Sequence, residues 1–344
     1  MATLKEQGFY MPGEWHPHKR CWMSWPSNGA GYSGRFAQAR EAAARVAAAI
    51  ARFEPVIMLA NEGDVAHARA LCGASVEVQA APIDDGWFRD NGPSFVIDGK
   101  GHMIGVNWDF NGWGAKPGIP FARDRAVTKL ILERVGITRV AAPLILEGGS
   151  FHVDGEGTLL TTEQCLLNPN RNPGLSRREI ERQLKDHLGV EAVIWLKQGV
   201  VDDLTDGHID LLSAFVAPGV VLALGCDDGA DANYAAIQEN LEILRGSRDA
   251  KGRAFEVIEV PQPQAAWNEA TGARLGLSHL NFYLANGGLI LPDFGMPESD
   301  ATALGLFREV FKDMEIVPVP SRDLLYAGGN IHCITQQEPV AGVG

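Results

Sequence analysis

The chain has 344 residues, 46% of them hydrophobic, and a formal net charge of −13 with a pI of about 5.2. This length supports a sizeable core, and an acidic chain without a Lys/Arg cluster argues against a nucleic-acid partner and suits a small cationic ligand. Five scattered cysteines without a C-x-x-C pair argue against a disulfide framework and a structural zinc site, and favour a reducing, cytoplasmic location.

In chain order, short apolar runs predict strands, and apolar residues at helical spacing predict helices. Residues 10–35, rich in Trp, Pro and His, predict a loop that leads into a strand. Apolar residues of segment 36–50 are spaced 3, 4, 3 and 4, which is typical of an amphipathic helix. Further strands are expected at 56–59, 76–80, 95–97, 103–106, 192–196, 256–260, 289–292 and 316–319, and helices near 64–71, 124–134, 234–244 and 301–311.

The clearest helix signals lie in residues 175–189. Ser176 and Glu179 fit a capping box, Leu175 and Ile180 fit a hydrophobic staple, and Gly189 fits a helix C-terminus. Strands that alternate with helices, without a low-complexity linker, predict an α/β class in which residues 1–344 form one domain.

Several common functions are disfavoured by missing signals. The apolar run 211–225 is broken at Pro218-Gly219, so it predicts two strands joined by a turn, and the N-terminus lacks a signal-peptide core. We therefore expect no membrane partner. Motifs for phosphate loops, dinucleotide binding, zinc peptidases and serine hydrolases are absent from the sequence, so we expect no cofactor.

The residues that could carry chemistry lie in four loop segments, each of which joins a carboxylate or nucleophile to glycine. These segments are 84–95, 147–155, 202–210 and 328–337. Loops on a rigid scaffold commonly carry function. In His208-Ile209-Asp210, a strand would point both polar side chains to one face. Cys333 follows Gly328 and other turn residues that could aim its sulfur into a cleft; the alternative is a buried cysteine in a late strand.

Other interpretations of these residues stay open. His208, Asp210, His332 and Cys333 are metal-ligand types, but their spacing matches no familiar zinc site, so we expect no metal. Taken singly, Asp90 could form an Asx turn, and Glu147 or His208 could be satisfied in a core. Asp90, Glu147, His208 and Cys333 are separated by 57, 61 and 125 residues, which suggests a module of 60–65 residues repeated five times. One module, near residue 270, would lack a marked residue.

Several segments, in order over nearly the whole chain, carry a specific resemblance. They are WMSWP at 22–26, DGWFRDNGP at 85–93, EGG at 147–149, DGEGTLLTTE at 154–163, NPNRNP at 168–173, TDGHID at 205–210, NFY at 281–283 and GGNIHCITQQ at 328–337. Together they resemble the agmatine deiminase family. The resemblance implies the guanidino-modifying pentein fold, with five ββαβ-type blades around a pseudo-fivefold axis. It also implies hydrolysis of agmatine to N-carbamoylputrescine and ammonia, a step of polyamine biosynthesis.

Two stretches depart from the family pattern. Leu211-Leu212-Ser213 is less polar than expected, and residues 118–124 form a shorter loop than we associate with agmatine enzymes. Both could line the far end of the substrate pocket, so the chemistry is better supported than the choice of substrate.

The resemblance and the charges together imply a mechanism. Asp90 and Asp210 would hold the planar guanidinium, and the Cys333 thiolate would attack its carbon. His208 would transfer the protons, and Glu147 would orient its imidazole.

The substrate would also contact residues around these five. Trp87 could cover the alkyl chain or the cation's face, or could simply pack in the core. Asp85, or its neighbour Asp84, is expected near the distal ammonium, and Gly329 and Asn330 beside the substrate.

Two other functions remain as alternatives. A related guanidino hydrolase or an amidinotransferase could act on arginine, peptidyl-arginine or a smaller compound, and a non-catalytic guanidine-binding protein could share the scaffold. The sequence does not fix the oligomeric state, so a homo-oligomer stays open.

Overall fold

The computed structural model describes residues 2–342, and within them the strands form five separate sheets. The strands are β1 (His18–Ser24), β2 (Val56–Ala60), β3 (Val76–Ala80), β4 (Ser94–Ile97), β5 (Met103–Asp109), β6 (Thr138–Ile145), β7 (Phe151–Val153), β8 (Thr158–Thr162), β9 (Ala192–Leu196), β10 (Ser213–Ala217), β11 (Val220–Gly225), β12 (Glu256–Pro261), β13 (Tyr283–Ala285), β14 (Gly288–Asp293), β15 (Glu315–Pro320) and β16 (Thr335–Pro339). The helices are α1 (Phe36–Ile50), α2 (Val65–Cys72), α3 (Phe88–Asn91), α4 (Gly112–Ala115), α5 (Asp124–Val135), α6 (Glu163–Leu166), α7 (Arg177–Leu188), α8 (Tyr234–Gly246) and α9 (Pro297–Val310).

One connection pattern recurs in every sheet. Two strands pair antiparallel, a helix follows, and the next strand pairs parallel with the second, as in β4, β5, α5 and β6. In the sheet that joins the chain ends, β16 pairs antiparallel with β1, and β2 pairs parallel with β1 after α1. The predicted five-module α/β fold is therefore confirmed.

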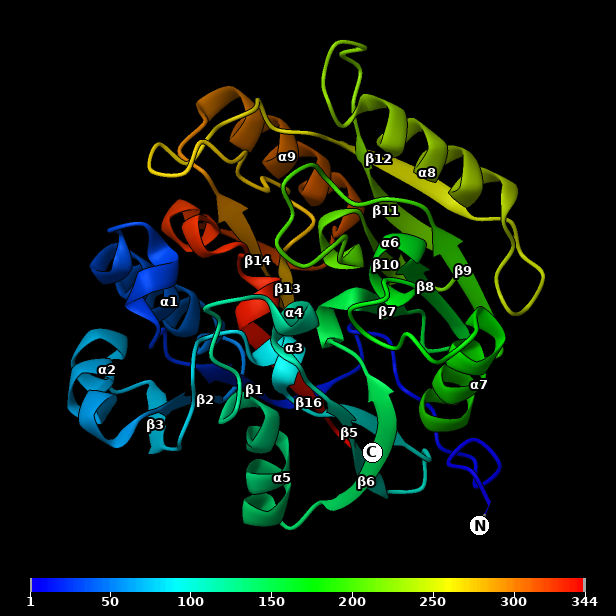
Figure 1. Ribbon diagram of the computed structural model, residues 1–344, viewed down its shortest axis with the longest axis horizontal. Helices are drawn as coiled ribbons and strands as arrows, with labels where there is room; N and C mark the ends of the chain where they lie inside the picture. Colours follow the sequence, from blue (N-terminus) through cyan, green and yellow to red (C-terminus); the bar gives the residue numbers. More distant parts are fainter. Residues whose placement is uncertain (1, 343–344) are drawn as a thin grey trace.

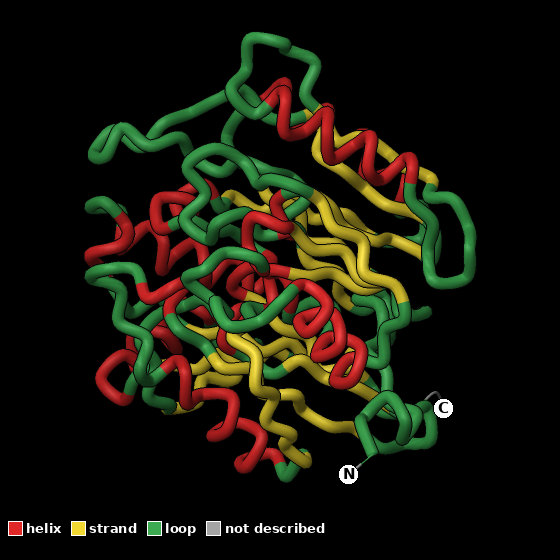
Figure 2. The backbone as a smooth tube through the Cα atoms, turned by 45° about the vertical axis from the view of Figure 1, so that its right-hand side comes forward, coloured by secondary structure: helices red, strands yellow, loops and turns green. Residues whose placement is uncertain are grey.

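The longer helices lie around the outside of these sheets. Figure 1 shows α1, α2, α5, α7, α8 and α9 at the periphery, with α3 and α4 near the middle. Figure 2 shows α8 running along the strands of its own sheet. Across residues 2–342, no helix is long and apolar enough to cross a membrane. The predicted capping box of Ser176 and Glu179 is present at the start of α7, and Gly189 ends that helix with φ 70°.

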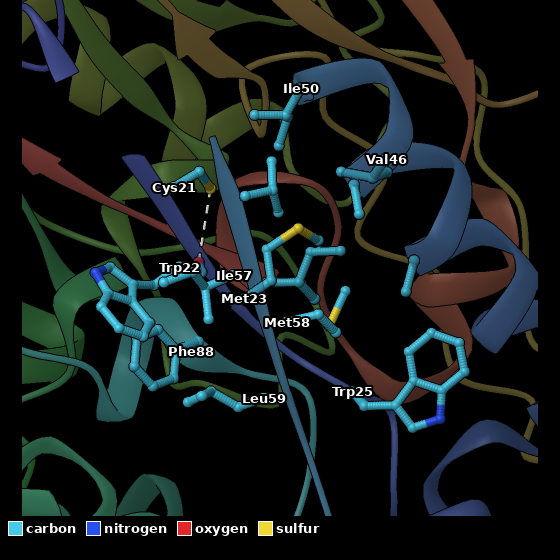
Figure 3. Packing of buried hydrophobic residues seen from close by; sticks show 14 of the residues in the cluster. Cys21, Trp22, Met23, Trp25, Val46, Ile50, Ile57, Met58, Leu59 and Phe88 are labelled. Carbon is cyan, nitrogen blue, oxygen red and sulfur yellow. Dashed lines mark hydrogen bonds between the residues drawn. The ribbon is translucent and has the colours of Figure 1, made fainter. Parts of the chain in front are cut away.

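A large apolar cluster anchors the segment that carries Asp90. Figure 3 shows Trp22 of β1 beside Phe88 of α3, while Met23 lies on the side of Val46 and Ile50 of α1. Trp22 and Phe88 are buried, with ring centroids 6.4 Å apart. Burial of such side chains contributes roughly 1.5–3 kcal/mol each, so α3 is fixed to the core directly before Asp90.

Some predicted local structures were wrong. His208-Ile209-Asp210 is not a strand, because His208 precedes a 3-10 turn at Ile209–Leu211. The segment 84–93 is not all loop, since it contains α3. For Cys333 only the alternative of a residue within a late strand was wrong, because it lies in a 3-10 turn, His332–Ile334, directly before β16. Such single turns bury polar and apolar residues alike, so neither helical nor alternating periodicity of apolar residues marks them.

Candidate active site

The structure brings together the five predicted catalytic residues, which come from the four loop segments. Asp90 lies in α3, Glu147 directly before the turn Gly148–Ser150, His208 and Asp210 at the turn Ile209–Leu211, and Cys333 in the turn His332–Ile334. All five are buried. The Cys333 thiol lies 3.3 Å from Asp210 Oδ2. His208 lies between two carboxylates, with Nδ1 3.7 Å from Asp90 Oδ1 and Nε2 3.8 Å from Glu147 Oε2.

Asp90 is held by two donors and is protonated more easily than an ordinary aspartate. The Gly149 amide donates to Oδ1 at 3.0 Å, and the Trp113 indole donates to Oδ2 at 2.8 Å. Burial raises the pKa of Asp90 to about 6; Asp210 and Glu147 push it upward, whereas His208 and Trp113 oppose the shift. The Asp90 charge is thus costly without a substrate, and a bound cation would relieve that cost.

Trp113 reaches Asp90 from a strained segment of backbone. The φ angles of residues 112–115 are 67°, 56°, 94° and 54°, so two non-glycine residues adopt left-handed conformations. The Asn111 side chain accepts a hydrogen bond from Gly114 N at 2.8 Å and stabilises the turn. Each such non-glycine conformation costs on the order of 1–3 kcal/mol, and strain of this kind concentrates at functional sites. The sequence patterns assigned no role to Trp113.

His208 and Glu147 form an ion pair supported from behind by Arg171. Burial lowers the pKa of His208, but Asp90 and Glu147 outweigh it, so the pKa lies well above its usual value. Arg171 Nε donates to Glu147 Oε1 at 2.8 Å. Burial raises the pKa of Glu147, yet its partners His208 and Arg171 hold it below the ordinary value. Within residues 2–342, neither His208 ring nitrogen has a hydrogen-bond partner.

The surroundings of Cys333 favour the neutral thiol. Burial, together with Asp210 and Asp90, raises its pKa well above the ordinary value. Asn281 supports the residue on both sides, because its Nδ2 donates to Sγ at 3.2 Å and its Oδ1 accepts from Cys333 N at 3.3 Å. Asn281 precedes β13, in the module expected to lack a marked residue. The only sequence signal for it was the NFY segment, to which no role was given.

Two glycines leave room beside these groups. A Cβ atom at Gly149 would lie 2.7 Å from His208 Nδ1, 2.8 Å from Asp90 Oδ1 and 3.0 Å from Asp210 Oδ2. A Cβ atom at Gly329 would lie 3.0 Å from Cys333 Sγ and 2.5 Å from the Trp87 ring. Any side chain at either position would therefore collide with the cluster.

The remaining substrate-binding candidates lie in different places. The Asn330 side chain donates to Ser321 O at 3.3 Å, so it is part of the scaffold. Trp87 extends from Gly329 to Asp85, whose Oδ2 accepts its indole N–H at 3.0 Å. Asp85 is buried and also accepts hydrogen bonds from the Ser27 and Asn28 amides.

Asp84 and Arg89 lie outside the cluster. Asp84 accepts a hydrogen bond from Arg123 N, at the start of α5, at 2.7 Å. Arg89 Nη1 donates to Glu14 Oε1 at 3.1 Å, and both side chains are buried. Asp84 therefore serves the N-terminus of α5, and Arg89 serves the scaffold behind the site.

Two buried groups within residues 2–342 contain metal-ligand side chains, namely Glu14, His152 and His332, and Glu147, Cys165 and His208. In the first group, Phe215 N donates to His152 Nδ1 at 3.3 Å, so the proton of a neutral His152 ring is on Nε2, which faces Glu14. His332 also directs a ring nitrogen at Glu14. This arrangement fits hydrogen bonds to a carboxylate better than metal ligation. In the second group, Glu147 already binds the Arg171 cation, which would repel a metal ion.

The chain is similar to known proteins over nearly its whole length. Residues 10–339 match the family model described as Porphyromonas-type peptidyl-arginine deiminase. The chain is 46% identical over 359 residues to the agmatine deiminase of Pseudomonas aeruginosa, covering 98% of this chain and 97% of that one. The chain belongs to the agmatine deiminase family. The family includes an equally similar protein of Stutzerimonas stutzeri, with 46% identity over 98% of this chain and 97% of that one. A solved agmatine deiminase of Enterococcus faecalis superimposes with a TM-score of 0.95 at 37% identity, covering 99% of this chain and 98% of that chain.

Proposed function

We propose that the chain, acting as one catalytic domain, hydrolyses agmatine to N-carbamoylputrescine and ammonia. The observation that carries this proposal is the convergence of one thiol, one imidazole and two carboxylates around Gly149. A planar cation placed there would meet an oxygen on each side and a sulfur beside it.

Binding the guanidinium is the first step. Asp90 and Asp210 accept its N–H groups, because carboxylates pair with this planar fork through charge-assisted hydrogen bonds. Asp90 keeps its orientation through Trp113 and Gly149, whose donors are already in place. The added positive charge lowers the pKa of the Cys333 thiol, which is otherwise raised by burial and by the two aspartates.

The covalent steps follow from the positions of sulfur and imidazole. The Cys333 thiolate forms a C–S bond with the guanidinium carbon, and protonated His208 gives its proton to the departing nitrogen, which leaves as ammonia. The product is an amidino-cysteine. Water, deprotonated by His208, then adds to the same carbon, which returns His208 to its protonated form. The C–S bond breaks, the hydroxyl proton of the adduct passes to the departing sulfur, and the carbonyl product leaves. This proton replaces the one that the thiol loses to solvent when the cation binds. Glu147, fixed by Arg171, orients the imidazole and stabilises its charged form.

The choice of agmatine rests on the far end of the site. Trp87 extends from the nucleophile to Asp85, so an alkyl chain that lay along this indole would bring its terminal ammonium toward a carboxylate. Arg89, the nearest cation in sequence, is buried in the scaffold, where it donates to Glu14 Oε1 and His332 O rather than lying along Trp87. Free arginine would therefore place a carboxylate near Asp85 without compensation.

Ammonia release from agmatine, arginine and short guanidino compounds tests this proposal. We expect kcat/KM for agmatine to exceed that for arginine by at least about two orders of magnitude, or about 2.7 kcal/mol. Comparable values would contradict the agmatine assignment while leaving the guanidine chemistry intact. Formation of a new C–N product when an amine is added would instead support an amidinotransferase.

A further inference from the structure

A second row of buried charges lies directly behind Asp210, and the mechanism above does not use it. The row runs from Arg89 through Glu14 and His332 to Asp210. Arg89 Nη1 donates to Glu14 Oε1 at 3.1 Å, His332 Nε2 lies 2.9 Å from the same oxygen, and His332 Nδ1 lies 2.9 Å from Asp210 Oδ2. All four side chains are buried.

Both nitrogens of the His332 ring face carboxylate oxygens. A neutral imidazole carries a proton on only one nitrogen. In one of these two contacts, an unprotonated ring nitrogen would then face a carboxylate oxygen, and both atoms are acceptors. Only the doubly protonated ring donates in both directions at 2.9 Å. Burial and Arg89 both lower the pKa of His332, but Glu14 and Asp210 outweigh them, so it lies above its ordinary value.

We propose that His332 and Glu14 are positioning residues for the reaction, with a cationic His332 holding Asp210 ionised and turned toward the substrate. This inference rests on the proposed function of Asp210 as one half of the guanidinium clamp.

The geometry around Asp210 explains why such support is needed. Asp210 Oδ2 accepts hydrogen bonds from His332 and from the Cys333 thiol, whereas Oδ1 has no hydrogen-bond partner among the described residues. The unused oxygen is the one that can accept guanidinium N–H groups. A buried carboxylate beside another carboxylate, Asp90, would otherwise take up a proton and lose its attraction for a cation.

Glu14 in turn fixes the charge and the tilt of His332. Its Oε1 binds His332 and Arg89, and its Oε2 lies 3.6 Å from His152 Nε2. The charges along the row alternate in sign, from Arg89 to Asp210, so the row is neutral when His332 is protonated. Removing one member would leave an uncompensated buried charge, which is far more costly than an intact pair.

The central test compares His332→Asn with wild type. The asparagine amide can still donate to Asp210 but carries no charge and cannot reach Glu14. The groups that face this pair are Arg89, Glu14 and His152 on the His332 side, and Cys333, His208 and Asp90 on the Asp210 side. We expect kcat/KM for agmatine to fall about 10- to 100-fold, mainly through KM, as for other residues that orient a ligand-binding group. We also expect the acid limb of the pH profile, which Asp90 sets in the wild type, to move upward, because Asp210 loses a neighbouring cation and its pKa rises toward that of Asp90.

Two variants separate positioning from general damage. Glu14→Gln keeps an oxygen for His332 Nε2 and should shift the acid limb in the same direction by a smaller amount. His279→Asn removes another buried histidine, which binds Asp300 at 3.0 Å away from the cluster, and should keep the wild-type profile. A wild-type acid limb and KM in His332→Asn would overturn the proposal, as would an equal shift in the His279 control.

A measurement on the unaltered protein remains decisive if the variants fold poorly. Nitrogen NMR of ¹⁵N-histidine-labelled wild-type protein, with His332 assigned, should show both of its ring nitrogens protonated at about pH 8, well above the ordinary histidine pKa. A neutral ring at that pH would overturn the proposal. If the enzyme prefers a guanidino substrate other than agmatine, the same variants are measured with that substrate, so failure of the substrate assignment is distinguishable from failure of this inference.

Discussion

Replacing Trp113 by phenylalanine tests whether the strained segment 112–115 serves to orient Asp90. The change keeps an aromatic ring against Phe110, whose centroid lies 5.2 Å away, but removes the indole N–H that donates to Asp90 Oδ2 at 2.8 Å. A hydrogen bond to a charged group contributes roughly 1.5–3 kcal/mol, so kcat/KM for agmatine should fall about 10- to 150-fold. Most of this loss should come from weaker binding of the guanidinium by Asp90, because the substitution leaves Cys333, His208 and Glu147 unchanged.

The same substitution should also shift the pH dependence of kcat/KM in a defined direction. Burial raises the pKa of Asp90 to about 6, and the Trp113 hydrogen bond counteracts part of that rise. Only the ionised carboxylate accepts N–H groups from the guanidinium with both oxygens, so kcat/KM falls as the pH drops through this pKa. Without the indole donor the pKa of Asp90 rises further, and the acid limb moves to higher pH. The defect should therefore be largest at and below about pH 6 and shrink toward about pH 8.

Ammonia release measured from about pH 5 to 9 checks this expectation, with thermal unfolding followed in parallel. Trp108→Phe is the matched control, since that buried indole donates at 3.0 Å to Ser94 Oγ, a neutral hydroxyl outside the cluster. A Trp113→Phe enzyme with the wild-type acid limb would refute the assigned role. Equal pH shifts in both variants would also refute it, because the effect would then come from lost packing.

Three further predictions address the nucleophile, the cofactor and the distal subsite. Cys333→Ser should abolish turnover with unfolding unchanged, since a hydroxyl does not ionise like a thiol, and a residual rate above about a tenth would contradict the covalent mechanism. Activity should survive exhaustive dialysis against a chelator, because Glu147 is already paired with Arg171, and loss reversed by one added divalent ion would favour a metal enzyme. Asp85→Asn should raise KM for agmatine more than it lowers kcat, because it removes a charge at the far end of Trp87; an unchanged KM would exclude Asp85 as the ammonium partner.

The sequence was most informative where chemistry is concentrated in short motifs. The four loop segments converge because each follows or precedes a strand of a similar module, and equal spacing along the chain reports this repetition. Helix α7 was recognisable because its capping box and C-terminal glycine are local signals. By contrast, β16 has the sequence TQQEP, and all five of its residues are buried, so hydrophobic patterning gives no indication of it.

The residues missed in the site are those whose partners are far away in sequence. Glu14 and His332 are separated by 318 positions in the sequence, and Asn281 and Cys333, which are in contact, by 52. Side-chain pairs between modules depend on the closure of the ring, in which β16 joins β1, and no local pattern encodes such closure. Trp113 was missed for a different reason: a positive φ at a non-glycine residue opposes its intrinsic preference, so local propensity predicts an unremarkable loop.

The charge balance of the site explains how a buried cysteine can be both protected and reactive. Without a substrate, Arg89 and His332 offset Glu14 and Asp210, and Arg171 and protonated His208 offset Glu147 and Asp90. Burial is the main reason why the pKa of Cys333 lies well above its ordinary value, and a thiolate would also add an unmatched negative charge beside Asp210 and Asp90. A bound guanidinium adds one positive charge at the same place, and the thiolate then restores neutrality. In the proposed mechanism, ionisation of Cys333 is thereby coupled to the presence of a cationic substrate, and a neutral molecule of similar shape would leave the sulfur protonated.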